Sequence, residues 1–353
     1  MSSGKINIRN LSFTELNEAI LLAGFPKFRA KQIYDWLWKN NASTFLDMKN
    51  LGNELILHLN GHYFIDHLSL DGIQKSKDKT IKCGFRTIDD QIIEGVLIPT
   101  SSRMTACISS QAGCSLSCAF CATGKLKLMK NLSVGELIDQ VVTLNELAKS
   151  NYNIPLSNIV LMGMGEPLLN YKQVISALAI LSDPDRFNIS PRRITLSTAG
   201  IAKQIKKLGD EQVRFNLALS LHAADDIKRS KVMEINDSNN LETLREALVY
   251  FYEKTGSRIT FEYILFNEFN DSLEDAANLA RFASCVPCKI NLIEYNSIGD
   301  IEFTKASIER TEAFKLFLER KNLIVNVRRS RGKDIDAACG QLANKTKAIT
   351  KGL

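Results

Sequence analysis

Three closely spaced cysteines are the residues of this sequence best suited to chemistry. Cys114, Cys118 and Cys121 form the pattern C-x-x-x-C-x-x-C in the string CSLSCAFC. Eight cysteines scattered over 353 residues would rarely produce this spacing by chance. Thiolates on one short loop are the usual ligands of a [4Fe–4S] cluster, and three of them leave one iron free to bind a further molecule. The spacing therefore predicts an iron–sulfur site with an open iron.

A structural zinc site is the alternative for the same loop, because zinc also takes thiolate ligands. The fourth ligand would then be Cys107, or a thiol of the pair Cys285 and Cys288. That pair brackets the start of a predicted strand, which favours a structural role for it. Cys83 receives no chemical role from the sequence, and neither do Cys285 and Cys288 if the cluster is an iron–sulfur cluster.

The overall composition is that of a globular protein, with 45% hydrophobic residues and a net charge of +6. No uninterrupted apolar run approaches the roughly 20 residues of a membrane span. The first ten residues, MSSGKINIRN, also lack the apolar stretch of a signal peptide. We therefore expect a cytoplasmic protein, and in that reducing compartment cysteines favour metal binding or catalysis over disulfide bonds.

Basic residues are grouped at three places along the chain, from Lys27 to Lys31, from Lys75 to Lys79 and from Arg328 to Lys333. Such patches suit a polyanion such as a nucleic acid. Because 24% charged residues is an ordinary content, solvated surface explains the same patches equally well.

Further polar motifs follow the cysteine loop at intervals along the chain. They are Gly163-Met-Gly165-Glu166-Pro167, Ser197, Ser220-Leu221-His222 and Asn296. Glycines let a backbone approach a ligand, a carboxylate accepts hydrogen bonds from an ammonium group, and serine or asparagine binds hydroxyls and carboxylates. Together these groups could hold an amino-acid nucleotide. Taken singly, each is weak, and His222 alone is better explained as a structural residue.

Six strand-like segments, each followed by a helix-like segment, occupy the chain from about residue 103 onward. This alternation predicts an α/β fold in which parallel strands are joined by helical crossovers. The sixfold repetition favours a curved, incomplete (β/α)6 barrel. The cysteine loop and the polar motifs each follow a strand, so they should gather at the carboxyl ends of the strands, where such barrels hold their sites.

The chain before the barrel divides into two parts. Residues 1–75 are predicted to form a small helical accessory domain, in which Ser12 and Glu15 make a capping box. A helix is also expected from Phe28 to Lys39, with Trp36 on its apolar face and therefore in the core. Residues 76–102 are predicted to be a β-hairpin linker region, and residues 103–353 the catalytic barrel with a C-terminal segment that carries Cys339.

Several longer strings resemble one family. CISSQAGCSLSCAFCATG, LMGMGEPLLN, ITLSTAG, LALSLHA and DIDAACGQL are similar to the RlmN/Cfr family of RNA methyltransferases, within the radical S-adenosylmethionine (SAM) superfamily. The resemblance runs from about Lys79 to Leu342, and the helical start fits the family's accessory domain. It implies a radical SAM barrel and a [4Fe–4S] cluster on the three spaced cysteines. It also implies SAM contacts by Gly165, Glu166, Ser197, Ser220, Leu221, His222 and Asn296.

The resemblance also implies roles for three further residues. Cys339 would carry the methyl group as S-methylcysteine, with two SAM molecules used per turnover. Cys107 would release the RNA by forming a transient disulfide with Cys339, and Glu94 would be the proton acceptor. Without the family, Cys107 is explained as a core thiol and Cys339 stays unassigned. Glu94 is then either a proton-transfer group or an edge-strand residue that points to water.

The implied reaction is methylation of C2 of adenosine in 23S rRNA, at the peptidyl transferase centre, and in tRNA next to the anticodon. The C2–H bond of adenine is not acidic, so polar methyl transfer would fail and radical chemistry is needed. The Cfr-type alternative methylates C8 of the same ribosomal adenosine. The string GMGEPLLN favours the C2 type, because the Cfr type resembles GMGEA at this point.

The implied partners are 23S rRNA, tRNA and an electron donor such as flavodoxin with its reductase. A monomer is expected, and the N-terminal unit, with Lys27, Arg29 and Lys31, is the candidate RNA contact. An alternative of another class is a non-catalytic, metal-containing RNA-binding protein. Replacement of Cys339 by alanine separates the two classes, since a binding protein would be indifferent to it.

Overall fold

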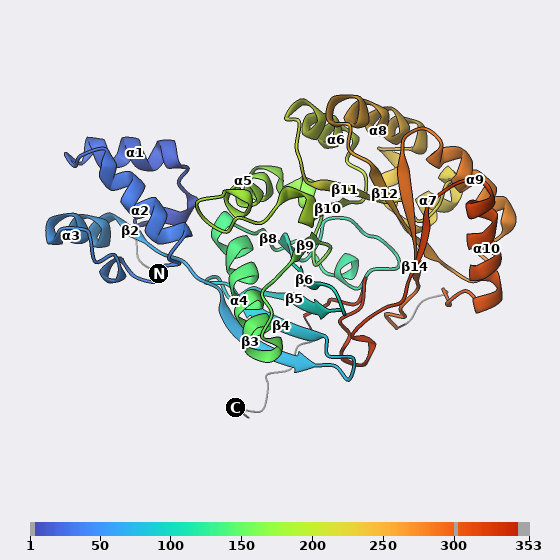
Figure 1. The fold of residues 1–353 in the computed structure, drawn as a ribbon, viewed down its shortest axis with the longest axis horizontal. Helices are drawn as coiled ribbons and strands as arrows, with labels where there is room; N and C mark the ends of the chain where they lie inside the picture. Colours follow the sequence, from blue (N-terminus) through green and yellow to red (C-terminus); the bar gives the residue numbers. More distant parts are fainter. Residues whose placement is uncertain (1–3, 300–302, 345–353) are drawn as a thin grey trace.

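The computed structural model describes residues 4–299 and 303–344. Its N-terminal unit consists of three helices and lies at one end of the molecule, away from the main body (Figure 1). These helices are α1 (Phe13–Leu22), α2 (Phe28–Trp38) and α3 (Asn53–His62), with a small parallel pair of β1 (Ile6–Asn7) and β2 (Tyr63–Phe64) beside them. No helix in the described part of the chain is both long and apolar enough to cross a membrane.

The local signals of this unit behave as the sequence predicts, with one exception. Ser12 accepts from the Glu15 backbone N–H and Glu15 accepts from the Ser12 N–H, so the capping box opens α1. In α2 the buried tryptophan is Trp38, which is 2% exposed, whereas Trp36 is half-buried and donates its indole N–H to Asn50. Trp36 therefore packs against the edge of the core and not inside it, while Trp38 lies inside the core under the Arg9 guanidinium.

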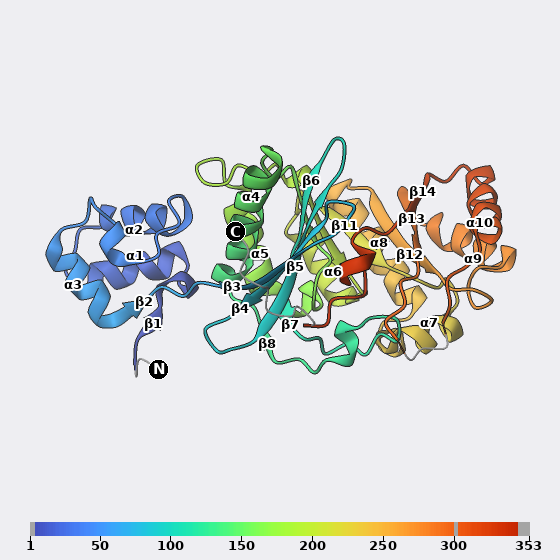
Figure 2. The same cartoon turned by 90° about the horizontal axis from the view of Figure 1, so that it is seen from below.

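The main body is built on one ten-stranded sheet, curved with helices on its outer side (Figure 2). Its parallel part contains β6 (Met104–Cys107), β9 (Asn158–Leu161), β10 (Ile194–Thr198), β11 (Asn216–Ser220), β12 (Ile259–Leu265), β13 (Cys288–Glu294) and β14 (Val325–Arg328). The predicted incomplete α/β barrel is confirmed. The strand β14 was not predicted, because its four residues alternate Val-Asn-Val-Arg and lack a hydrophobic run.

The six predicted crossover helices follow the strands in the predicted order, and a seventh helix, α7, was not predicted. They are α4 (Val134–Tyr152), α5 (Tyr171–Ser182), α6 (Ala202–Asp210), α7 (Asp226–Val232), α8 (Leu241–Thr255), α9 (Leu273–Ala283) and α10 (Ile308–Arg320). Short 3-10 helices lie at Ile8–Asn10, Phe45–Asp47, Thr123–Lys125, Pro167–Asn170, Pro191–Arg193, Glu234–Asp237 and Lys333–Ile335. Every residue of β12 is buried, as expected for a parallel strand that is covered on both faces.

Three antiparallel strands extend the sheet beyond β6. They are β3 (Ser69–Lys75), β4 (Ile81–Arg86) and β5 (Ile92–Pro99), while β7 (Gln111–Ala112) and β8 (Lys130–Asn131) form a separate small pair. The predicted hairpin is present as β4 and β5, but it belongs to the barrel sheet and does not act as a linker. The predicted domain boundary after residue 75 therefore assigns β3, a strand of that same sheet, to the N-terminal domain.

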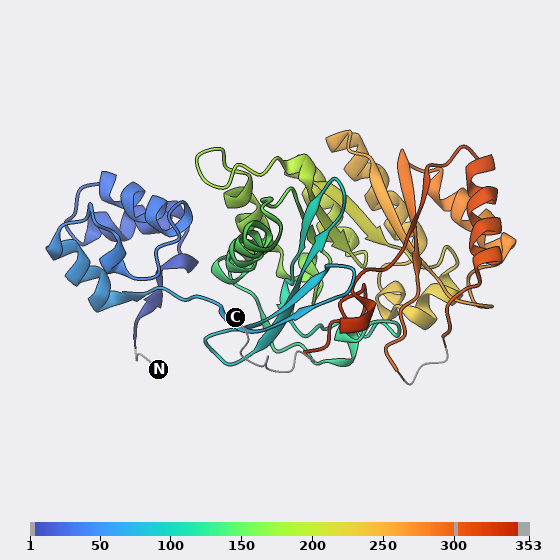
Figure 3. The same ribbon diagram turned by 60° about the horizontal axis from the view of Figure 1, so that its bottom comes forward.

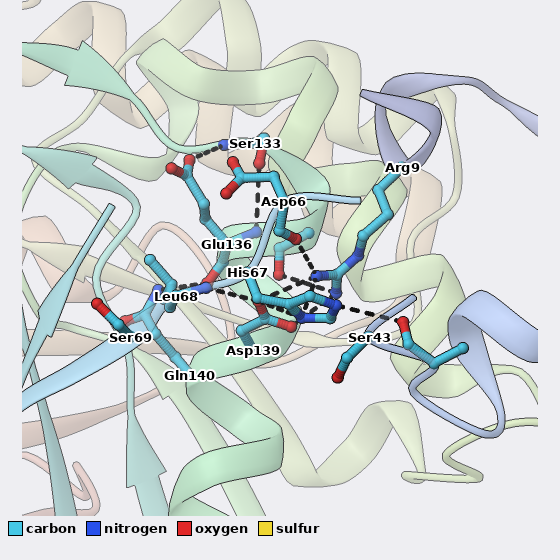
Figure 4. Close-up of polar contacts among 12 residues, drawn as sticks. Arg9, Ser43, Asp66, His67, Leu68, Ser69, Ser133, Glu136, Asp139 and Gln140 are labelled. Carbon is cyan, nitrogen blue, oxygen red and sulfur yellow. Dashed lines mark hydrogen bonds and ion pairs between the residues drawn. The ribbon is translucent and has the colours of Figure 1, made fainter. Parts of the chain in front are cut away.

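A buried ion pair joins the N-terminal unit to the barrel (Figure 4). The Arg9 guanidinium donates to both carboxylate oxygens of Asp139 on α4, at 2.7 and 3.0 Å, and to the backbone carbonyls of Asp66 and Gly135. His67 places Nδ1 3.1 Å from Arg9 Nη1 and 3.3 Å from Asp139 Oδ2, and it places Nε2 3.2 Å from the Ala42 carbonyl. These contacts fix the orientation of the two parts of the chain.

The segment after β14, residues 332–344, crosses the open side of the curved sheet beside β4 and β5 (Figure 3). We call it the Cys339 segment. It is held to the turn before β4, where Asp78 accepts from the Gly332 N–H at 2.9 Å and Ser76 donates to Asp334 at 2.5 Å. A polar segment of this kind needs tertiary partners to be ordered, and the antiparallel extension supplies them.

Candidate active site

One pocket at the carboxyl ends of the parallel strands gathers most of the predicted site residues. Its wall includes Cys107, Cys114, Cys118, Cys121, Gly165, Glu166, Ser197, Ser220, His222 and Cys339. These positions come from loops after different strands and are far apart in the sequence. Their convergence follows from the barrel, because parallel strands end at one common edge.

The cysteine loop is a compact turn that is tied to the Cys339 segment. The Cys121 N–H donates to the Cys118 carbonyl at 3.1 Å, and a side chain at Gly124 would lie only 2.9 Å from that same carbonyl. The loop then continues into two bonds with the Cys339 segment. Ala122 donates its N–H to the Gly340 carbonyl at 2.7 Å, and the Thr123 hydroxyl donates to the Leu342 carbonyl at 2.6 Å.

The three loop thiols fit a cationic cluster. Burial raises the pKa of Cys114 to about 11, and it also raises the pKa values of Cys118 and Cys121. The negative charge of each neighbouring thiolate adds to the shifts of Cys114 and Cys118. Three buried thiols so close together become thiolates when a metal centre takes up their charge. The donor set therefore suits a [4Fe–4S] cluster with one open iron.

The geometry separates the two candidate fourth ligands of the zinc alternative. Cys107 lines the same pocket as the three loop cysteines, whereas the pair Cys285 and Cys288 does not. Cys288 is the first residue of β13, so the pair with Cys285 lies at the opposite end of the strands from the pocket. A seven-residue strand spans roughly 20 Å, too far for a shared zinc ion. Cys83 is fully buried on β4.

The motif around Gly165 and Glu166 is shaped by close backbone packing. Gly165 has a φ of +90°, and an added Cβ would lie 2.4 Å from the Cβ of Gln111. Glu166 is buried, and its carboxylate accepts from the backbone N–H of Leu168 at 3.0 Å and of Ala199 at 2.7 Å. Burial nevertheless raises the pKa of Glu166. Its carboxylate is thus a buried acceptor on the pocket wall, as an ammonium ligand requires.

Ser197 and Ser220 end neighbouring strands, and their hydroxyl oxygens lie 3.4 Å apart on the pocket wall. His222 follows in a left-handed conformation, with a φ of +56°. Its Nδ1 accepts from the Ile264 backbone N–H at 3.1 Å, and burial lowers its pKa to about 3. The ring is therefore neutral with its proton on Nε2, and it can donate one hydrogen bond from that atom.

Two of the predicted SAM contacts lie outside the pocket wall. Leu221 is fully buried in the core, and its carbonyl accepts from the Arg229 guanidinium. Asn296 is also buried and donates to the Cys339 carbonyl at 3.3 Å. Direct SAM contact by these two residues stays a prediction. The amide of Asn296 also donates to the Glu294 carbonyl at 3.4 Å, so its described contacts are with the protein backbone.

Cys107 and Cys339 lie far apart in the sequence but line the same pocket. Cys107 ends β6 and is buried, whereas Cys339 is exposed within the Cys339 segment. Burial raises the pKa of Cys107 to about 12, and the nearby charge of Cys339 adds to that shift. Both residues line the same pocket, and a transient disulfide between them stays a prediction.

Arg328 is a site residue that sequence reasoning missed. The sequence places it in a basic group suited to a polyanion or to solvated surface, but as the last residue of β14 it turns onto the pocket wall and donates to Glu262 at 3.1 Å. Burial opposes its charge, but Cys339, Glu262 and Cys107 together raise its pKa. The alternation of Val325 and Val327 with polar residues is a strand pattern that could have placed Arg328 on the polar face. That face could be assigned to the pocket only once β14 was known to pair with β13.

Glu94 is fully buried on β5, an inner strand, so the edge-strand alternative that pointed it to water is wrong. Its Oε2 accepts from the backbone N–H groups of Ala343 and Asn344, at 2.9 and 3.2 Å. Its Oε1 lies 3.4 Å from Lys82 Nζ. Val96, the next residue on the same face of β5, lines the pocket. Glu94 itself lies beside the pocket, under the Cys339 segment.

Comparisons with known proteins agree with this fold. A model of the Radical SAM superfamily matches residues 108–280, and one of the Ribosomal RNA large subunit methyltransferase N-terminal domain matches residues 6–65. The chain is 53% identical to a probable dual-specificity RNA methyltransferase RlmN of Cytophaga hutchinsonii, over 96% of this chain and 93% of that protein. It is 41% identical to the dual-specificity RNA methyltransferase RlmN of Geotalea uraniireducens, over 98% and 99% of the two chains.

A solved structure shows the same architecture. The crystal structure of a radical SAM methyltransferase from Sphaerobacter thermophilus matches with a TM-score of 0.88 and 38% identity, over 96% of this chain and 99% of that chain. Fold and site thus define an enzyme of the radical SAM superfamily, which uses a [4Fe–4S] cluster and SAM. Within that class, the chain belongs to the RlmN family of RNA methyltransferases.

Proposed function

We propose that this enzyme methylates C2 of adenosine in 23S rRNA and in tRNA, through S-methylcysteine at Cys339. The observation that carries the proposal is the shared pocket of Cys339, Cys107 and the cysteine loop. A methyl group bound to Cys339 would lie in the same chamber as the cluster and SAM. A non-catalytic binding protein has no use for this arrangement.

Cys114, Cys118 and Cys121 would hold the cluster, which together with SAM would supply radical chemistry able to break an unreactive C–H bond. The pocket wall orients that SAM. Glu166 offers a carboxylate to the SAM ammonium group, while the Ser197 and Ser220 hydroxyls offer hydrogen bonds to its polar groups.

Cys339 provides the sulfur that first accepts the methyl group and later links the methyl carbon to the RNA base. Cys107 then attacks the Cys339 sulfur and forms an S–S bond. The breaking S–C bond leaves its electron pair on the transferred carbon, which takes up a proton and becomes the methyl group of the RNA. The resulting disulfide needs a dithiol reductant before the next turnover.

Glu94 is the proposed proton acceptor for the hydrogen that leaves C2. Two backbone N–H groups donate to its Oε2, which requires acceptor lone pairs and fits the carboxylate form. Because both donors belong to the Cys339 segment, access of Glu94 to the base depends on the position of that segment. The proton acceptor and the methyl carrier are therefore coupled mechanically.

The proposed RNA contact is the N-terminal unit, in which Lys27 and Lys31 are exposed. Exposed ammonium groups bind phosphates without base specificity, and an unpaired base can then enter the pocket. We further propose flavodoxin and its reductase as electron donor, a monomeric enzyme and a cytoplasmic location, where both RNA substrates occur.

The decisive experiment combines anaerobically reconstituted enzyme, SAM, a reductant and ribosomal RNA or tRNA from cells that lack the modification. Nucleosides are then analysed by mass spectrometry. Formation of 2-methyladenosine that is lost in Cys339→Ala supports the proposal. Formation of 8-methyladenosine assigns the enzyme to the Cfr type, and SAM cleavage without modification of either RNA overturns the substrate assignment.

A further inference from the structure

Lys82 is a fully buried lysine that no step of the proposed reaction uses. Its side chain on β4 is 1% exposed, and its partner Glu94 on β5 is 0% exposed. The two residues lie on adjacent antiparallel strands, and the Nζ–Oε1 distance is 3.4 Å. Burial of an ammonium group costs several kcal/mol, so a lysine at this depth calls for a specific reason.

The pair lies directly beneath the Cys339 segment and contacts it on both sides of Cys339. Lys82 Nζ lies 3.5 Å from the carbonyl of Asp336, three residues before Cys339. Glu94 Oε2 accepts from Ala343 and Asn344, four and five residues after it. One cation and one anion therefore anchor the two flanks of the same segment, through backbone groups alone.

The remaining contacts of the segment do not replace this anchor. Ala122 and Thr123 bind the carbonyls of Gly340 and Leu342, and thereby tie the segment to the cysteine loop. Ser76 and Asp78 hold the start of the segment at the turn before β4, and Asn296 binds the Cys339 carbonyl. In the described residues, the hydrogen bonds between strands β4 or β5 themselves and positions 336–344 come from Lys82 and Glu94.

We propose that Lys82 is a positioning residue. Through Glu94 and the Asp336 carbonyl, it holds the Cys339 segment at the height where the Cys339 sulfur enters the pocket. The inference rests on the proposed function, because only that function gives Cys339 a chemical role. Lys82 compensates the charge of Glu94, so that Glu94 can bind the two N–H groups of the segment in a dry environment.

The first test measures position without any catalysis. Amide hydrogen exchange of the full chain, with the cluster but without SAM or RNA, is followed at residues 336–344 in the wild type and in Lys82→Met. We expect the Ala343 and Asn344 amides to exchange about tenfold faster or more in the variant, because charge-assisted hydrogen bonds are lost. Unchanged exchange in Lys82→Met overturns the proposal.

The second test separates the two half-reactions. Mass spectrometry of the protein gives the fraction of Cys339 that is methylated, and deoxyadenosine formation gives the amount of SAM cleaved. In Lys82→Met we expect methylation of Cys339 to slow about tenfold, while more SAM is cleaved per methyl group transferred to RNA. An equal loss of all three, with a loss of cluster, indicates general unfolding and overturns a positioning role.

Two further variants control for stability and for charge. Cys83→Ala removes a buried side chain from the same strand, on the opposite face, and should leave exchange at 343–344 unchanged. The double variant Lys82→Met with Glu94→Gln removes both charges but keeps an acceptor oxygen. It should restore slow exchange and Cys339 methylation, though not RNA methylation. If the wild type methylates no RNA, the proposed function fails, while the exchange data still decide the role of Lys82.

Discussion

Two buried ion pairs hold this molecule together in different ways. At the domain junction, Arg9 binds Asp139 through two short bonds and also binds two backbone carbonyls. Beneath the Cys339 segment, Lys82 lies 3.4 Å from Glu94 and 3.5 Å from a carbonyl. The Arg9 pair has several short hydrogen bonds. The contacts of Lys82 are longer, and they reach a segment that must also release RNA in the proposed reaction.

The difference follows from the two cations. A guanidinium offers five N–H donors in a fixed plane, which suits a permanent, bidentate junction. An ammonium group is a compact charge on a flexible stem, which tolerates small movements of its partners. We infer that the Arg9 pair stabilises the fold and that the Lys82 pair positions the Cys339 segment. Substitutions at the first pair should therefore affect mainly stability, and those at the second mainly activity.

The largest expected effect is on activity, at the second pair. Glu94→Gln should lower RNA methylation by about 10² to 10⁴, the usual contribution of a proton-transfer group. Methylation of Cys339 should persist, because glutamine keeps an acceptor oxygen for the Ala343 and Asn344 amides. Nucleoside and protein mass spectrometry measure the two steps separately, and full RNA methylation by this variant would exclude Glu94 as the proton acceptor.

The next effect is on stability, at the first pair. Asp139→Asn leaves the fully buried Arg9 without its carboxylate and should lower the free energy of unfolding by about 3–5 kcal/mol. Burial alone would raise the pKa of Asp139, but His67 and Arg9 lower it, so this carboxylate is charged in the folded protein. Denaturant unfolding measures the change. A loss below about 1 kcal/mol would contradict the role of the pair in stability.

A pH dependence of stability sharpens the picture of the junction. Burial raises the pKa of Asp66 to about 6, and the charge of Glu136, toward which its carboxylate points in Figure 4, adds to this. The folded protein thus binds this proton more tightly than the unfolded chain. Asp66 should therefore lower the free energy of unfolding by up to about 3 kcal/mol as pH rises from about 4 to above 6.

Asp66→Asn removes that penalty. The variant should match the wild type near pH 4 and exceed its unfolding free energy at pH 7.5, as measured by denaturant unfolding at both pH values. Asp90→Asn is the matched control, because the Asp90 side chain is 83% exposed. A constant difference between Asp66→Asn and the wild type over this range would refute the assignment.

The smallest effect is expected at an exposed pair of the same kind. Lys31 binds Asp35 at 3.1 Å, but its side chain is 70% exposed. Lys31→Met should change the free energy of unfolding by less than about 0.5 kcal/mol. If the N-terminal unit contacts RNA, the same variant should weaken RNA binding and reduce its salt dependence by about one charge. Filter-binding assays at several salt concentrations measure this.

The parts of the site that could be predicted from sequence are local. The spacing of Cys114, Cys118 and Cys121 fits one loop, and Ser197 and Ser220 each end a recognisable strand. Because the strands are parallel, their ends had to meet. Whether Leu221 and Asn296 face the pocket was harder to predict. Both residues follow the end of a strand, and there the direction of a side chain depends on how the next loop packs.

Spacing and hydrophobic periodicity act over short distances along the chain, so the barrel, the order of the site motifs and the loop expected to hold the cluster could be predicted. The positions of Arg328 at the pocket, and of Lys82 and Glu94 under the Cys339 segment, could be learned from the tertiary structure alone. Those positions depend on β14 joining the sheet and on residues 332–344 packing against β4 and β5. Such contacts join residues about 250 positions apart, and no local pattern records them.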